Sequence, residues 1–111
     1  GVKHVQDFTY DNEGEKEAET SVYEVTLRSG EKVFAVNGGL LDFPMKCVYS
    51  TKFPNPEIAS KYHLYTVSHY AIKRLSMFEG QEVQETREAI EEFKESLELP
   101  EEYVKIANRE K

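Results

Sequence analysis

The sequence predicts a single α+β domain, residues 1–111, in which an antiparallel sheet of about five to six strands precedes two C-terminal helices. Residues 1–78 are expected to be mainly β, because apolar and polar residues alternate over several short stretches. Residues 79–111 are expected to be helical, because apolar side chains recur at helical spacing among many glutamates. The length of 111 residues is typical of one domain.

The first strands are expected at the start of the chain. Residues 2–10 are rich in β-forming residues and are expected to form a strand, whereas residues 11–20 have no apolar period and are expected to form an exposed loop. Residues 22–28 alternate well and predict a second strand. Its more apolar face is expected to consist of Tyr23, Val25 and Leu27.

A hairpin is expected to follow this strand. Ser29 and Gly30 indicate a short turn into a strand over residues 32–36. The Asn-Gly-Gly run at 37–39 is expected to end that strand, since glycine adopts turn conformations at little steric cost. Residues 45–51 are expected to form a further strand.

Residues 57–78 allow two interpretations. As a helix, the segment would have Asn55 as its cap and Pro56 in its first turn, with an apolar stripe formed by Leu64, Val67, Ala71, Leu75 and Phe78. As two strands, residues 62–67 and 72–78 would use their many β-branched and aromatic side chains. Because several of these residues are mediocre helix formers, two strands are favoured.

The last third of the chain predicts two helices. Residues 82–97 are amphipathic, with an apolar stripe formed by Val83, Ile90, Phe93 and Leu97. Pro100 and the two acids after it are typical of the first turn of a second, shorter helix. The apolar stripe needs a surface to cover it, either the chain's own sheet or another subunit, and a homo-oligomer is expected.

The charge of the chain limits its partners. The 14 basic and 21 acidic residues give a net charge of −7, although residues 25–78 carry an excess of bases. Long nucleic acid is disfavoured, because its phosphate backbone would be repelled. No apolar run approaches the roughly 20 residues that span a bilayer, so no membrane partner is expected. The single cysteine and the lack of a recognisable secretory signal favour the cytoplasm, or the host cell cytoplasm if the protein is viral.

No familiar catalytic, phosphate-binding or metal-binding motif occurs in the sequence. Cys47 is interpreted as a small core residue of a strand rather than a nucleophile. His63 and His69 are six positions apart with no acid close by, so they are interpreted as structural residues rather than metal ligands. We therefore expect no enzymatic activity, no cofactor and no metal.

Two groups of residues are candidates for binding. The first is basic and aromatic, and predicts a site for a small anionic nucleotide, because arginine contacts two phosphate oxygens at once and aromatic rings stack on bases. Its members are Arg28, His69, Tyr70, Lys73 and Arg74. The second is a row of glutamates along the first C-terminal helix, Glu85, Glu88, Glu92 and Glu95, which would suit an acidic inhibitor that binds a basic protein directly. An ordinary solvated surface is the simpler explanation of either group.

An antiparallel sheet followed by two C-terminal helices, in a chain of this length, resembles the phage-encoded anti-Thoeris sponge proteins. This resemblance covers most of the chain as topology and includes no diagnostic motif. It implies a non-enzymatic oligomer that sequesters cyclic ADP-ribose-type signals and so counteracts host immune signalling. It also implies that arginines of the sheet and of the C-terminal helical end hold the pyrophosphate, and the matching positions here are Arg28 and Arg109, the latter in the final NREK.

Overall fold

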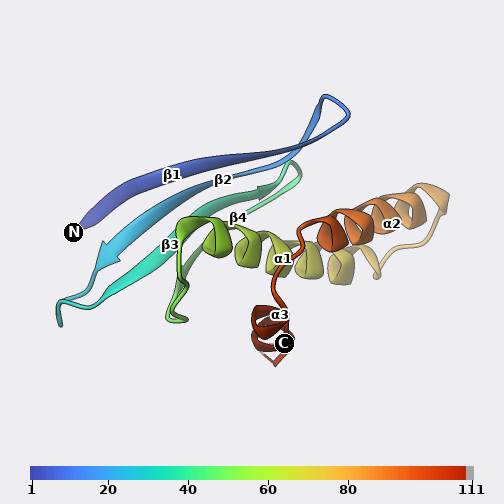
Figure 1. Ribbon diagram of the computed structural model, residues 1–111. Coiled ribbons are helices and arrows are strands. Elements are labelled where there is room, and N and C mark those ends of the chain that lie inside the picture. The colour runs from blue at the N-terminus through green and yellow to red at the C-terminus, as the bar shows by residue number, and fades with distance from the viewer. Residues whose placement is uncertain (110–111) are drawn as a thin grey trace.

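The computed structural model describes residues 1–109 and has two layers, a sheet and a group of helices (Figure 1). The sheet is antiparallel, and its four strands follow one another in chain order: β1 (Val2–Asn12), β2 (Glu15–Thr26), β3 (Lys32–Leu40) and β4 (Phe43–Tyr49). The predicted α+β class is confirmed. The expected five to six strands are not, because the segment assigned to the additional strands is helical.

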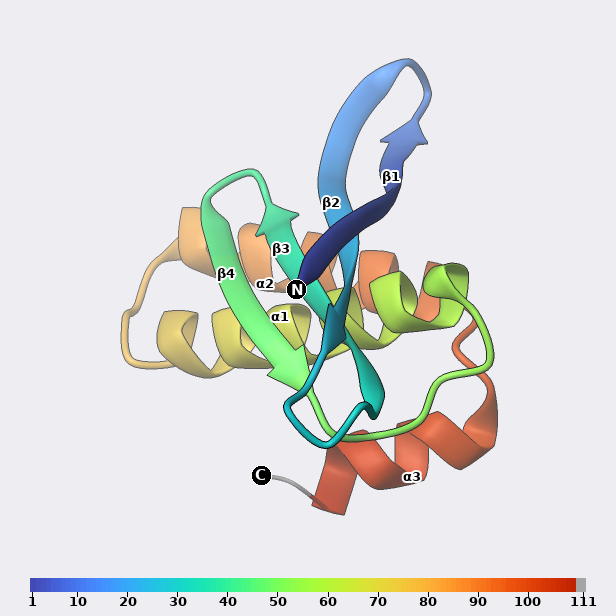
Figure 2. The same ribbon diagram turned by 90° about the vertical axis from the view of Figure 1, so that its left-hand side faces the viewer.

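The helices lie on one side of the sheet and leave its other face uncovered (Figure 2). They are α1 (Pro56–Leu75), α2 (Gln81–Ser96) and α3 (Glu101–Arg109). The longest, α1, contacts all four strands and both other helices, so it is the centre of the helical layer. Residues 1–109 thus contain three helices where two were expected, and the division between strands and helices comes near residue 50 rather than at residue 78. Over residues 1–109, no helix has the length and apolar character needed to cross a membrane.

The expected loop at residues 11–20 is wrong, because these residues form a β-hairpin. Asn12 pairs with Glu15, and the two residues between them, Glu13 and Gly14, have φ values of 51° and 84°. Positive φ at both central positions is typical of the tight turn that joins twisted antiparallel strands. The tip of this hairpin extends beyond the helices (Figure 1), and its residues are exposed on both faces of the sheet. Apolar and polar residues therefore do not alternate at the tip, so the sequence pattern does not indicate a strand there.

The Asn-Gly-Gly run does not end β3, which continues to Leu40. Gly38 pairs with Thr20 of β2, and a Cβ atom at this glycine would collide with the main-chain oxygen of Glu19. Gly39 lies against the main chain of Phe43 in the same way. The two glycines therefore allow close approach of neighbouring strands rather than a chain reversal.

The two-strand interpretation of residues 57–78 is also wrong, and α1 follows the helical alternative. The Asn55 side chain accepts a hydrogen bond of 2.9 Å from the main-chain N–H of Ile58, and Pro56 occupies the first turn. Tyr62, His63 and Leu64 are fully buried although tyrosine and histidine are mediocre helix formers. Burial of this face outweighs the weak local preference of its residues.

The expected C-terminal helices are confirmed as α2 and α3, and three of the four residues of the expected apolar stripe are buried within the chain. Ile90, Phe93 and Leu97 share a buried cluster with three residues of α1 and with Ala18 and Leu40 of the sheet. The surface that covers this stripe is mainly α1. A second subunit is therefore not needed to bury these three residues, whereas Val83 remains half-buried.

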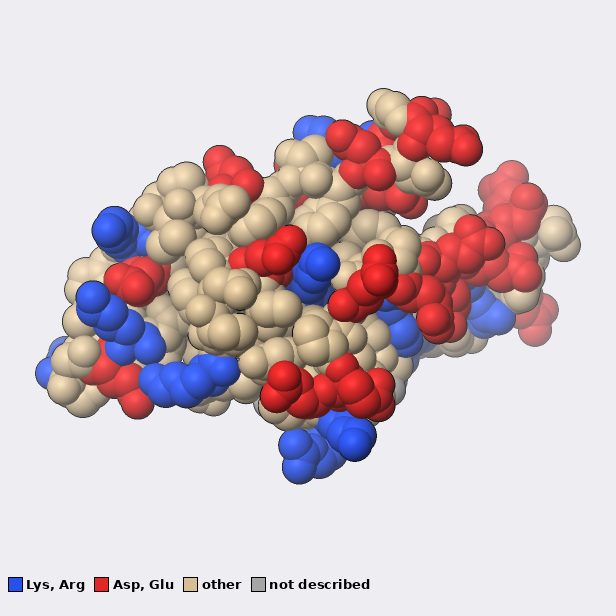
Figure 3. All heavy atoms as spheres, in the orientation of Figure 1, with Lys and Arg blue, Asp and Glu red and all other residues tan. Residues whose placement is uncertain are grey.

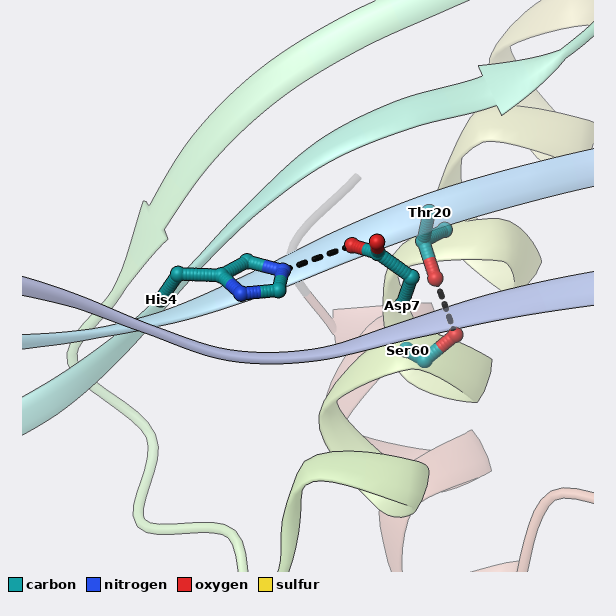
Figure 4. Close-up of polar contacts among 4 residues, drawn as sticks. All are labelled: His4, Asp7, Thr20 and Ser60. Carbon is teal, nitrogen blue, oxygen red and sulfur yellow. Dashed lines mark hydrogen bonds and ion pairs between the residues drawn. The ribbon is translucent and has the colours of Figure 1, made fainter.

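The buried face of β2 is the opposite of the one expected. Ala18, Thr20 and Val22 face the helices and are at most 3% exposed, whereas Tyr23 lies on the uncovered face beside the ring of His4. Thr20 and Ser60 of α1 share a buried hydrogen bond of 2.6 Å between sheet and helix (Figure 4). The same Ser60 hydroxyl lies 2.7 Å from the Tyr10 hydroxyl, so one helical serine links two strands to α1.

Candidate functional site

A cavity of about 500 Å³ lies between β4, the second half of α1 and the end of α3. We call it the β4–α1 cavity. Alternate residues of β4 reach it from one side, and residues three or four apart on α1 reach it from the other, as expected for side chains that share one face of a strand and of a helix. Its lining residues are Met45, Cys47, Tyr49, Tyr65, Thr66, His69, Tyr70, Lys73 and Ala107.

One wall of the cavity rests on a buried pair of neutral side chains. The Tyr49 hydroxyl lies 2.6 Å from Nδ1 of His63, and Nε2 of His63 lies 2.8 Å from the main-chain oxygen of Gly38. Because a carbonyl only accepts, Nε2 carries the ring proton and Nδ1 accepts from Tyr49. Burial lowers the pKa of His63 and raises the pKa of Tyr49, so both groups are uncharged near neutral pH.

Three tyrosine rings give the cavity an aromatic lining, and cations lie against two of them. Nζ of Lys94 lies 5.0 Å from the centre of the Tyr65 ring. The guanidinium of Arg74 lies 5.8 Å from the centre of the Tyr70 ring and donates a hydrogen bond of 3.0 Å to its hydroxyl. These rings are therefore held by electrostatic contacts as well as by packing.

The polar groups of the cavity are mainly cationic or hydrogen-bonding. Lys73 is exposed and has no ion pair or hydrogen bond within residues 1–109. Nδ1 of His69 lies 3.3 Å from Nζ of Lys94 and accepts from it, because an ammonium group only donates. Among residues 1–109, no Asp or Glu lines the cavity. Its electrostatic character therefore favours an anion over a cation.

The structure brings together part of the predicted site. His69 and Tyr70 line the cavity, and Arg74 contacts Tyr70. Arg109 is the last residue of α3, two positions after the lining residue Ala107. Arg28 lies in the turn between β2 and β3 and does not line the cavity.

The sequence interpretation missed the contribution of β4 and of Tyr65. Tyr49 and Cys47 come from the strand, and nothing in the spacing of the sequence links them to α1. Thr66, His69, Tyr70 and Lys73 share one helical face. The helical alternative for residues 57–78 would have placed these four side chains together.

A histidine–carboxylate pair also lies on β1, outside the cavity. Nε2 of His4 is 2.7 Å from Oδ1 of Asp7 on the sheet face that points away from α1 (Figure 4). The hydrogen bond from His4 lowers the pKa of Asp7. Both side chains are at least half exposed. The pair has the geometry of a surface ion pair rather than of a sheltered acid–base site.

The cavity is suited to binding a planar molecule that carries negative charge. Aromatic rings and thioether or thiol groups supply apolar contact, while Lys73 supplies charge beside them. Across the described part of the chain, no three His, Cys, Asp or Glu side chains gather as metal ligands would. Comparison of the chain with protein-family models, with curated proteins and with solved structures finds no match.

Proposed function

We propose that this chain is a non-enzymatic binding protein that holds a small anionic nucleotide in the β4–α1 cavity. The observation that carries the proposal is the combination of three tyrosines, Tyr49, Tyr65 and Tyr70, with the ammonium group of Lys73, which has no ion-pair partner among residues 1–109, around a space of about 500 Å³. Pockets of roughly 300–1,000 Å³ accommodate ligands of this size.

The charges around the cavity support one orientation of the ligand. Tyr49 and His63 form a neutral wall, where a charged group would lose hydration without gaining an opposite charge. Lys73 is exposed and Arg74 lies beside Tyr70, so the cations are near solvent. The base therefore lies among the tyrosines and the phosphate lies toward Lys73.

The more specific form of the proposal is sequestration of a cyclic ADP-ribose-type signal, which would counteract host immune signalling. It is motivated by the resemblance to the anti-Thoeris sponge proteins and by the anionic, aromatic nature of the ligand that suits the cavity. The cavity differs from the site which that resemblance implies, because neither Arg28 nor Arg109 is among its lining residues.

Isothermal titration calorimetry with a matched set of ligands tests this proposal. AMP, ADP-ribose and cyclic ADP-ribose each combine a base with phosphate, whereas adenosine lacks the phosphate and ribose 5-phosphate lacks the base. We expect at least one of the first three to bind, and both fragments to bind at least about tenfold more weakly. The absence of binding by all three complete nucleotides would contradict the proposal.

Substitutions locate the site. Lys73→Ala should weaken binding roughly 10- to 150-fold, as expected for loss of a charged hydrogen bond. Lys3→Ala is the matched control, because Lys3 is an exposed lysine on β1 and does not line the cavity. Arg28→Ala and Arg109→Ala distinguish this cavity from the site implied by the resemblance. If these two variants weaken binding and Lys73→Ala does not, the ligand lies elsewhere.

A further inference from the structure

A groove lies between the turn that joins β3 to β4 and the middle of α2, with a volume of about 380 Å³. Its floor is apolar and consists of Leu40, Leu41, Phe43, Ala89, Ile90 and Phe93. Leu41, in the turn itself, is 59% exposed. An exposed leucine beside an open apolar surface is typical of a place where another molecule binds. The groove shares no lining residue with the β4–α1 cavity, so it is a separate site.

Acidic side chains border this groove. Glu17 comes from β2, Asp42 from the β3–β4 turn and Glu85 from α2, and no Lys, Arg or His of the described residues lines the groove. None of the three carboxylates has an ion-pair partner among residues 1–109. In Figure 3, acidic side chains gather over the tip of the β1–β2 hairpin and over α2, on the two sides of a notch. A partner would therefore meet negative charge on several sides and an apolar surface between them.

We propose that this groove binds a cationic amphipathic helix of a partner protein. Charge complementarity requires Lys or Arg on the partner, and the apolar floor requires a hydrophobic stripe between those bases. From Glu85 to Phe93 the wall formed by α2 is roughly 12 Å long at 1.5 Å per residue, so about two turns of a partner helix fill it. The walls are side chains of a helix and a turn rather than an unpaired strand edge, which favours a helix in the groove over an added strand.

The test uses a synthetic peptide of about four helical turns, built from two copies of LKKLLKL and labelled for fluorescence anisotropy. Its controls are the same peptide with glutamate in place of lysine and a scrambled peptide of identical composition. We expect the amphipathic lysine peptide to bind and both controls to bind at least about tenfold more weakly. Equal binding of the scrambled peptide would overturn the proposal, because it would show attraction to charge without a shaped site.

Two triple variants separate the groove from the general acidity of the surface. Glu17→Gln, Asp42→Asn and Glu85→Gln together remove the groove carboxylates, and binding should weaken roughly tenfold. The control triple variant, Glu15→Gln, Glu88→Gln and Glu92→Gln, changes the net charge equally at exposed positions of β2 and α2 outside the groove. It should bind within about twofold of the parent. Equal loss in both triple variants would overturn the proposal.

A single substitution separates apolar contact from charge. Leu41→Asp adds a fourth acid to the groove while removing exposed apolar surface. If the peptide's leucines bind there, affinity should fall roughly 3- to 10-fold, since a buried leucine contributes more than an exposed ion pair. If charge alone holds the peptide, affinity should rise, which would overturn the proposal. Amide resonances that shift on binding should cluster at residues 40–43 and 85–93, and shifts confined to other residues would also overturn it.

Discussion

The Tyr49 hydroxyl donates a hydrogen bond of 2.6 Å to Nδ1 of His63, which joins the edge strand β4 to α1 beside the cavity. His63 is fully buried, and its Nε2 donates a second hydrogen bond to the Gly38 carbonyl of β3. A single imidazole thus fixes two strands against the central helix. The cavity wall depends on this contact for its position, because Tyr49 is itself a lining residue.

Removal of the Tyr49 hydroxyl should destabilise the fold. Tyr49→Phe leaves Nδ1 of His63 buried without a donor, so the free energy of unfolding should fall by about 1–3 kcal/mol. Urea denaturation measures the change. Tyr70→Phe is the control, because its hydroxyl contacts Arg74 at the surface and its loss should cost less than about 0.5 kcal/mol. An equal loss of stability in the two variants would contradict the contribution of the hydrogen bond between Tyr49 and His63.

The stability of the protein should fall as the pH is lowered below about 6.5. Burial lowers the pKa of His63 in the folded chain, so the unfolded chain takes up a proton first as the pH drops. The free energy of unfolding then decreases, by up to about 1.4 kcal/mol per pH unit, until the folded-state pKa is reached. Denaturation curves between pH 7.5 and about 5.5 measure this slope. His63 ring resonances that titrate with an ordinary pKa in the folded protein would contradict the prediction.

Gly38 should tolerate no side chain. Gly38→Ala places a Cβ against the Glu19 main chain and forces an L-residue to a φ of 117°, so a loss of about 2–5 kcal/mol is expected. Gly14→Asn is the control, because no atom lies near that glycine and asparagine adopts positive φ more readily than most residues, so the loss should be smaller than for Gly38→Ala. Thermal unfolding compares the two variants. A Gly38→Ala protein as stable as the parent would show that β2 and β3 are less closely apposed.

Loss of the cap of α1 should reveal how much the helix depends on its first turn. Asn55→Ala removes the acceptor for the Ile58 N–H and should destabilise the protein by about 1 kcal/mol. Asn55→Asp retains an acceptor and should remain close to the parent. Chemical denaturation followed by circular dichroism measures both variants. If alanine and aspartate behave alike, the cap contributes nothing.

The number of ligands bound per chain tests the location of the site. If the ligand lies wholly within the β4–α1 cavity, as we propose, calorimetry should give one ligand per chain. The homo-oligomer expected from the sequence stays a prediction, and light scattering of the same sample measures it. A ratio of one ligand to two chains would instead place the ligand between subunits.

The sequence by itself determined the fold class and those helices and strands that are indicated by residues close together in the chain. The helices α2 and α3 follow from apolar spacing and from Pro100, and β1 follows from its β-forming residues. Asn55 and Pro56 indicated the start of α1 in the helical alternative, through the chemistry of a cap that depends only on adjacent residues, although two strands were favoured for the segment that follows. These signals involve neighbours in the chain, so they can be read without knowledge of the packing.

The tertiary structure decided what residues 57–75 become and where the cavity lies. Tyr62 and His63 lie in a helix because one face of α1 is buried against the sheet. The free energy of that burial is not part of the intrinsic helix propensity of either residue. The hairpin at residues 11–20 has no buried face at its tip, so its strands are defined by pairing rather than by pattern. The cavity joins Tyr49 of β4 to Tyr70 of α1 and Ala107 of α3. Segments so far apart in the chain become neighbours only when α1 packs on the sheet, because their contact depends on long-range burial rather than on residue spacing.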